Sequence, residues 1–181
     1  MELVDAHAHL CAPEFGDDLP AVLEAAAAAG VARVIAVGED LEDARRNLDV
    51  AARFPMVRAC AGLYPTILDE AAAEAMVAFI REHRDRLVGI GEVGLDHWIV
   101  QHEAEREVQR RILARFVALS NELDLPLNVH SRSAGRAAIQ LLREQEARRV
   151  LLHAFDGKAS SAQDGVAAGY FFSIPPSVVR S

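Results

Sequence analysis

The feature that most constrains the fold is a regular alternation of short apolar runs with longer amphipathic segments along the whole chain. Several of the apolar runs are nearly continuous rather than period-two patterns, which is typical of parallel strands covered on both faces. The runs are 2–10, 32–38, 57–63, 87–95, 125–131, 149–155 and 169–175. This β–α alternation predicts a parallel sheet, either an open doubly wound sheet or a barrel.

The segments between these runs have the signals of helices. They are 17–30, 41–54, 68–86, 102–124, 133–147 and 160–169. The segment 68–86 begins acidic and ends basic, which matches the helix dipole. The longest segment, 102–124, has apolar residues at three- and four-residue spacing and is expected to bury one face. No linker or low-complexity tract interrupts this rhythm, so we expect one domain over residues 1–181.

Length and composition exclude several classes of protein. A chain of 181 residues suffices for one domain with a sizeable core. The stretch AVLEAAAAAG is too short to span a bilayer and contains Glu24, and the start MELVDAHAHL lacks the pattern of a secretory signal. Two cysteines, Cys11 and Cys60, do not make a disulfide framework. We therefore expect a cytoplasmic globular protein without membrane contact.

The charge balance bears on the kind of substrate. The chain has 27 acidic and 19 basic residues, a formal net charge of −8. This balance argues against binding nucleic acid through a basic surface alone. If the substrate is a polyanion, a local positive charge such as a metal ion must offset that field.

Polar residues gather at the carboxyl ends of the expected strands. The first strand ends in DAHAHL, with His7 and His9, and the fourth holds Glu92 within GEVGLD. The fifth and sixth strands end in His130 and His153. Residues i and i+2 of a strand share a face, so His7 and His9 point the same way. In a (β/α)8 barrel these strand ends converge at one mouth, where active sites are built.

Taken together, these five residues favour a metal site. Imidazole and carboxylate suit Zn²⁺, Mn²⁺ or a related divalent ion. A glutamate between two sets of histidines indicates a bridging carboxylate and two metals, roughly 3.5–4 Å apart. Each residue alone has a simpler interpretation: a single strand-end histidine is more often a hydrogen-bonded core residue, and Glu92 could cap the next segment.

Neighbouring residues add further candidates. Arg132 follows His130 closely and could present a bidentate guanidinium to a phosphate, or be an ordinary surface arginine. Asp96 and Asp156 are interpreted first as turn formers and second as site residues. His97 follows the GLD motif closely enough to reach the mouth.

Four motifs in order, DAHAHL, GEVGLD, LNVHSR and LLHAFDG, resemble the TatD family of metal-dependent deoxyribonucleases, within the amidohydrolase-like barrels. The stretches NVHSRSAGR and YFFSIPPSVVRS resemble its archaeal-type branch. The resemblance implies a distorted (β/α)8 barrel of the TIM-barrel type and hydrolysis of DNA phosphodiester bonds, typically exonucleolytic, by a metal-activated water. It also implies two divalent ions (Zn, Mg or Mn). Their ligands would be His7, His9, His130, His153 and a bridging, catalytic Glu92.

Two features depart from the family pattern. Tyr64 stands in GLYPTIL where the family often has histidine, so it and Arg132 are candidate substrate-binding residues. The chain stops at Ser181, after the seventh expected strand, whereas the family continues through an eighth strand that ends in a metal-binding aspartate. We therefore expect residues 1–181 to form a C-terminally incomplete barrel that lacks the eighth strand and the C-terminal helix. Truncation, a homo-oligomer paired through open barrel edges, and a degenerate protein are the three explanations, and the abrupt end favours truncation.

Two other functions stay open. An amidohydrolase-type enzyme acting on a small amide, ester or lactone would use similar ligands. Such sites commonly depend on a carboxylated lysine, however, and Lys158 is the only lysine in the chain. Alternatively, a chain without the final aspartate could be a non-catalytic metal-binding module.

Overall fold

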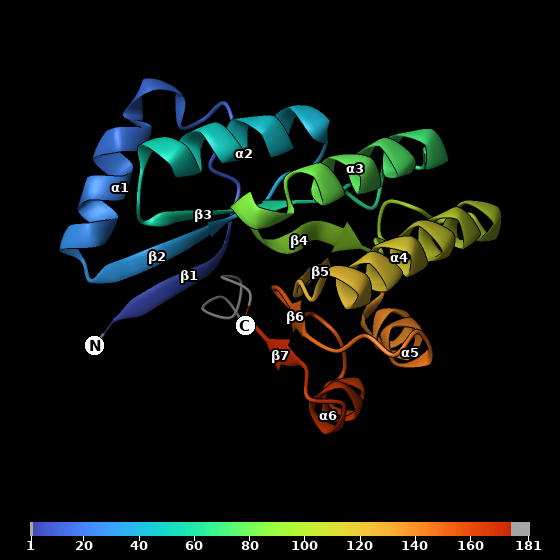
Figure 1. Cartoon of the computed structure of the whole chain (residues 1–181). Helices are drawn as coiled ribbons and strands as arrows, with labels where there is room; N and C mark the ends of the chain where they lie inside the picture. Colours follow the sequence, from blue (N-terminus) through green and yellow to red (C-terminus); the bar gives the residue numbers. More distant parts are fainter. Residues whose placement is uncertain (1, 175–181) are drawn as a thin grey trace.

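The computed structural model describes residues 2–174, in which seven strands alternate with six α-helices (Figure 1). The strands are β1 (Leu3–Ala8), β2 (Val31–Ala36), β3 (Val57–Ala61), β4 (Leu87–Gly94), β5 (Leu127–His130), β6 (Val150–Leu152) and β7 (Phe171–Phe172). The α-helices are α1 (Leu19–Ala28), α2 (Leu41–Arg53), α3 (Glu70–Glu82), α4 (Glu103–Leu123), α5 (Gly135–Glu144) and α6 (Ala159–Ala167). Two short 3₁₀ turns, η1 (Gly16–Asp18) and η2 (Arg84–Arg86), precede α1 and β4. Residues 175–181, which include most of the motif SIPPSVVRS and the chain end, lie outside the described residues.

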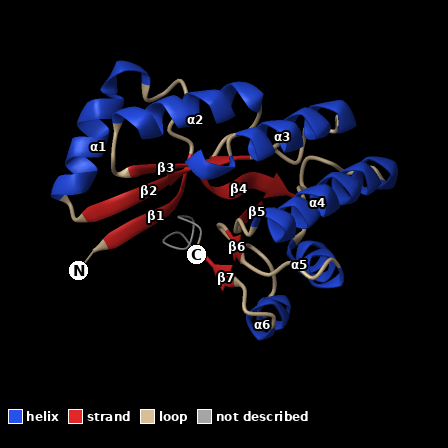
Figure 2. Ribbon diagram, in the orientation of Figure 1, coloured by secondary structure: helices blue, strands red, loops and turns tan. Residues whose placement is uncertain are grey.

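The strands form one parallel sheet in which neighbours follow sequence order, from β1 to β7. A doubly wound sheet would reverse its strand order partway, so this order identifies the barrel alternative. The helices lie along the outer side of the curved sheet (Figure 2). The expected fold class is therefore confirmed as a TIM-barrel-type arrangement, of which the described residues form seven strands of an open sheet.

Local sequence explains where two of the helices begin. Asp40 and Asp69 are the N-caps of α2 and α3, and each carboxylate accepts the backbone N–H groups two and three residues further on. This cap satisfies N–H groups that have no partner inside the helix. None of the described helices is both long and apolar enough to cross a membrane.

The apolar core lies between the sheet and its helices. Its larger cluster packs β3 to β6 against α3, α4 and α5, with Met76, Ile80, Leu113 and Phe116 fully buried. A smaller cluster lies under α1 and includes Leu23. Because the helices cover the outer side, polar residues on these strands are left to the inner side and to the carboxyl ends.

The strands are shorter than the apolar runs that predict them, mostly at their carboxyl ends. β1 ends at Ala8 and β6 ends at Leu152, so His9 and His153 lie just beyond the last strand residue. Parallel strands end in the loops that build a barrel's active site, and the expected site residues are therefore at strand tips and in the first loop positions.

Candidate metal centre

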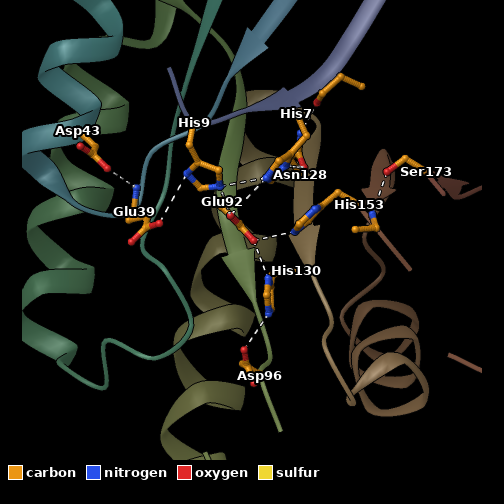
Figure 3. Close-up of polar contacts among 12 residues, drawn as sticks. His7, His9, Glu39, Asp43, Glu92, Asp96, Asn128, His130, His153 and Ser173 are labelled. Carbon is orange, nitrogen blue, oxygen red and sulfur yellow. Dashed lines mark hydrogen bonds and ion pairs between the residues drawn. The ribbon is translucent and has the colours of Figure 1, made fainter. Parts of the chain in front are cut away.

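The five residues predicted as ligands converge on one point (Figure 3). Glu92, on β4, is in the middle and only 1% exposed. His7 reaches it from β1, His9 from the loop after β1, His130 from the end of β5 and His153 from the loop after β6. Residues separated by up to 146 positions in the sequence, from 7 to 153, therefore form a single cluster.

The two oxygens of Glu92 divide the histidines into pairs. Oε1 lies 2.6 Å from Nδ1 of His130 and 2.7 Å from Nε2 of His153. Oε2 lies 3.0 Å from Nε2 of His9 and 3.4 Å from Nε2 of His7. The glutamate thus presents one oxygen to each pair of imidazoles, as the sequence predicts for a bridging carboxylate.

Glycines let the neighbouring backbone approach Glu92 this closely. A Cβ atom at Gly62, just after β3, would lie 2.4 Å from the carbonyl oxygen of Glu92. Gly94, in the same GEVG motif as Glu92, has φ +150°, and a Cβ there would lie 2.1 Å from the carbonyl oxygen of His130. Side chains at either position would push the strands apart, so these glycines are part of the site's construction.

Electrostatics inside the cluster favour a charged glutamate. Burial opposes the negative charge of Glu92, but hydrogen bonds with His130 and His153, followed by the contacts of His7 and His9, outweigh it and hold the Glu92 pKa below its usual range. The contact with Glu92 raises the pKa of His9 despite its burial. Burial lowers the pKa of His130, but the bonds to Glu92 and Asp96 outweigh burial, so the pKa is raised overall.

His153 shifts in the opposite direction. Its burial outweighs the bond to Glu92 and lowers its pKa. A lowered pKa keeps the imidazole neutral near pH 7, and the neutral imidazole is the form that binds metals.

The cluster has the donor atoms of a divalent-metal site. One ligand atom each from His7, Glu92 and His153 lies within 4.8 Å of the others. Glu92 Oε2 is buried and accepts no well-aligned hydrogen bond, although such an orphaned oxygen is costly in a protein interior. Imidazole nitrogens and a carboxylate suit Zn²⁺ and Mn²⁺, so the residues present fit the expected kind of ion.

Asn128 belongs to the site although sequence reasoning missed it. Its side-chain N–H donates to the carbonyl of Ala6 at 2.8 Å, which turns its oxygen toward Nδ1 of His7 at 2.9 Å. Nδ1 of His7 therefore donates to Asn128, which fixes the orientation of the ring and directs Nε2 at Glu92. The available signal is spacing, because Asn128 is two residues before His130 and shares its face of β5.

Asp96 is both a turn former and a neighbour of the cluster. It is 0% exposed, and its Oδ2 lies 3.0 Å from Nε2 of His130. Its Oδ1 accepts the backbone N–H groups of Trp98 and Ile99, at 2.9 and 2.8 Å. The sequence favours a turn role for Asp96 over a role in the site, but the one carboxylate forms the turn and also contacts His130. Asp156 does not form a turn: its carboxylate accepts the backbone N–H of Ser133, 23 positions earlier, and so joins the loop after β6 to the loop after β5.

The two candidate substrate-binding residues flank the cluster. The Tyr64 ring packs edge-on to His130, with 5.2 Å between ring centroids. Burial, with the nearby charges of Glu92 and Asp96, raises the pKa of Tyr64 to about 12. The Arg132 guanidinium lies over the indole of Trp98, 5.1 Å from its centroid. His97 stays outside the cluster, with its Nε2 buried and unpaired.

A barrel-type parallel sheet with a His/Glu centre at its strand ends is the architecture of a metal-dependent hydrolase. Comparison with known proteins narrows this class. The sequence model of the family described as TatD related DNase matches residues 4–181. The chain belongs to this family.

Individual relatives agree with this assignment. Human deoxyribonuclease TATDN3 is 44% identical over 99% of this chain and 70% of its own length. The metal-dependent hydrolase YabD of Bacillus subtilis is 31% identical over 94% of this chain and 68% of its own length. The crystal structure of YjjV, a TatD homologue from Escherichia coli, superposes with a TM-score of 0.85 at 28% identity. The superposition covers 94% of this chain and 66% of the YjjV chain.

Two points follow from the relatives. The mouse and human TATDN3 proteins, at 46% and 44% identity, do not support the expected archaeal-type branch. The chain spans about two thirds of the length of these relatives, 65% of the mouse protein and 70% of the human one.

Proposed function

We propose that this protein hydrolyses phosphodiester bonds in DNA, as an exonuclease, with two divalent metal ions as cofactors and residues 1–181 forming its hydrolase domain. The observation that carries the proposal is the buried Glu92, with a pair of histidines at each of its oxygens. The membership of the chain in the TatD related DNase family supports DNA as the substrate.

The pairing suggests how the ligands divide. His7 and His9 would hold one ion, His130 and His153 the other, and Glu92 would contribute an oxygen to each. Zn²⁺, Mn²⁺ and Mg²⁺ are the candidates, and the four imidazoles favour the first two. When bound, such ions supply Lewis acidity and a water that is acidic near neutral pH.

The chain's own residues supply the rest of the chemistry. Asn128 and Asp96 orient His7 and His130 through their second ring nitrogens. Tyr64, with a pKa of about 12, keeps its proton at neutral pH and can donate a hydrogen bond to a phosphate oxygen. Arg132 adds a permanent positive charge beside His130, which helps to offset the net charge of −8 for a polyanionic substrate.

The position of the single lysine counts against the small-substrate amidohydrolase. Lys158 is the N-cap of α6 and lines a surface cavity with Ser133 and Asp156. Among the residues that the structure describes, the His/Glu cluster therefore has no lysine that could be carboxylated to bridge two metals.

Location and assembly are separate proposals. Both cysteines are free thiols, which fits a reducing cytoplasm. The outermost strands, β1 and β7, expose Val4 and Phe171, and exposed apolar edge strands favour pairing between chains. Light scattering on the purified chain tests the second proposal, and a monomer at all concentrations would refute it.

The function is tested by metal content and turnover together. We expect elemental analysis of the purified chain to find Zn²⁺ or Mn²⁺. Short single-stranded DNA labelled at either end should lose terminal nucleotides when Mg²⁺, Mn²⁺ or Zn²⁺ is added. Bound metal without hydrolysis of any DNA would refute the proposed nuclease activity of this chain, and hydrolysis in the presence of a chelator would refute the metal requirement.

A further inference from the structure

We propose that Trp98 and Arg132 form a stacking platform beside the metal centre, which binds an unpaired nucleobase of single-stranded DNA. The inference rests on the proposed deoxyribonuclease function and names the form of DNA that the site would take. It assigns a binding role to Trp98, which the mechanism above does not use.

The first argument is the exposure of the indole. Trp98 is 58% exposed and the adjacent Ile99 is 57% exposed, in the loop between β4 and α4. Burying an aromatic ring is strongly favourable, so a tryptophan held in water contributes little to folding. An aromatic ring left exposed in a loop beside a site, with a face to stack on, is typical of ligand contact.

The second argument is the partner of the indole. The guanidinium of Arg132 lies 5.1 Å from the ring centroid, within the range of a cation–π contact. No ion pair of Arg132 with an acidic side chain occurs in residues 2–174. The pair therefore presents a flat π surface together with a positive charge that is not neutralised, which is the combination that single-stranded nucleic acid binders use.

The third argument is the rigidity of the loop. Asp96 fixes the backbone N–H groups of Trp98 and Ile99, and the N–H of His97 donates to the carbonyl of Arg132 at 3.0 Å. The Arg106 side chain donates to the carbonyl of Val100 at 2.9 Å. A loop that is already ordered loses little entropy when a ligand binds, so the exposed indole is pre-organised.

The fourth argument is the connection to the metal centre. Asp96 accepts the Trp98 N–H with one oxygen and contacts Nε2 of His130 with the other. Arg132 is two residues after His130 in the chain, and its charge acts on the Tyr64 phenol, which packs on His130. Both halves of the platform are thus tied to the same metal-ligand histidine.

The form of the substrate follows from the geometry of stacking. Bases in a duplex are stacked on each other and paired, so their faces are not free. An exposed indole can take an unpaired base, for instance at a strand end, and does so with little regard to its sequence. A platform next to the centre would therefore position a single-stranded end for hydrolysis.

Trp98 is the only tryptophan of the chain, so its fluorescence reports the platform directly. The probe is an oligothymidylate with phosphorothioate linkages, which resists hydrolysis, and the control is the abasic strand of the same length. We expect the oligothymidylate to quench the emission in a saturable way. The abasic strand should bind about tenfold more weakly and should not quench.

Variants distinguish stacking on the indole from a general effect of exposed apolar surface. Trp98→Ala has no tryptophan to fluoresce, so the affinity of every variant for DNA is measured by the anisotropy of a fluorescein-labelled strand. Trp98→Ala should lose about tenfold in affinity for oligothymidylate and nothing for the abasic strand, whereas Trp98→Phe should keep most of it. Ile99→Ala, an equally exposed residue of the same loop without a π face, is the matched control and should bind as the unmodified chain does.

The outcomes distinguish the two proposals. Equal affinity for the two strands, or equal effects of Trp98→Ala and Ile99→Ala, would overturn the platform while leaving the nuclease proposal standing. Tighter binding of a blunt duplex than of the single strand would also overturn the platform. Failure of every DNA to bind the metal-loaded chain, with no hydrolysis, would overturn the nuclease proposal and the platform with it.

Discussion

The two sides of β5 are both buried but chemically opposite. Leu127 and Val129 pack into the apolar core, whereas Asn128 and His130 face the His/Glu cluster. Burial of the first pair removes apolar surface from water and stabilises the fold. Burial of the second removes hydrogen-bonding and ionisable groups from water, which costs free energy unless partners compensate. The apolar core therefore accounts for the stability of the fold. The polar cluster costs stability and is better explained by the metal that it would bind.

The substitution with the largest expected effect is Glu92→Gln at the centre of the cluster. The amide keeps the shape of the side chain but lacks the charge and one of the two acceptor oxygens. We expect metal affinity to fall by more than about a hundredfold, beyond the range for residues that merely orient ligands. Calorimetric titration with Zn²⁺ and Mn²⁺ measures this, with circular dichroism to confirm that the variant is folded.

A matched control separates charge in general from this carboxylate in particular. Glu39 lies 3.6 Å from His9 but is half-exposed, at 51%. Glu39→Gln should change metal affinity only slightly, because water screens that contact. Similar losses for the two variants would contradict the central role of Glu92.

Phe116→Ala tests the other side of the comparison. The ring is fully buried on α4 in the large core cluster. Its removal should lower the free energy of unfolding by about 3–5 kcal/mol. Below the unfolding transition, the affinity of the remaining folded protein for metal should be unchanged. Denaturant titration and calorimetry measure the two quantities, and a parallel loss of metal affinity would show that core and cluster are not separable.

Asp96→Asn tests whether Asp96 positions a ligand or only forms a turn. An asparagine oxygen can still accept the N–H groups of Trp98 and Ile99, but its amide cannot accept from Nε2 of His130. We expect metal affinity to drop about 10–100-fold with little change in stability. A loss of stability without a loss of affinity would reduce Asp96 to a turn residue.

The smallest effect is expected for Asp69→Ala, which is the control for Asp96→Asn. Asp69 accepts the backbone N–H groups of Ala71 and Ala72, the same pattern that Asp96 makes, but it caps α3 and has no hydrogen bond to a histidine in residues 2–174. We expect a loss of about 1 kcal/mol in the free energy of unfolding. Metal affinity should stay the same, and any clear change in it would show that this affinity follows general stability.

Sequence reasoning predicts the fold well because the β–α rhythm is a local signal. Each of the seven apolar runs overlaps one observed strand, and each helical segment overlaps one α-helix; only β2 and α6 begin one residue before the predicted range. Strand ends are less well predicted, since an apolar residue such as Leu95 can be buried in a loop as well as in a strand. The choice between barrel and doubly wound sheet needs the strand order, which composition does not contain.

The site is predicted in part for a related reason. His7, His9, Glu92, His130 and His153 are residue types with a strong metal preference at strand ends, so they stand out. Asn128 does not stand out, and Asp96 stands out only as a second interpretation after a turn former, because their roles depend on which ring nitrogen they face across the barrel. The contact between Arg132 and Trp98 joins two loops after different strands and has no signal in local spacing.

The central claim is that these five side chains form one metal centre, and anomalous diffraction tests it most directly. Crystals of the chain grown with Mn²⁺ or Zn²⁺ would be measured at wavelengths on either side of the metal's absorption edge. The account predicts anomalous peaks at Glu92, one within ligand distance of His7 and His9 and the other of His130 and His153. Peaks elsewhere, or none at Glu92 in metal-saturated crystals, would contradict it.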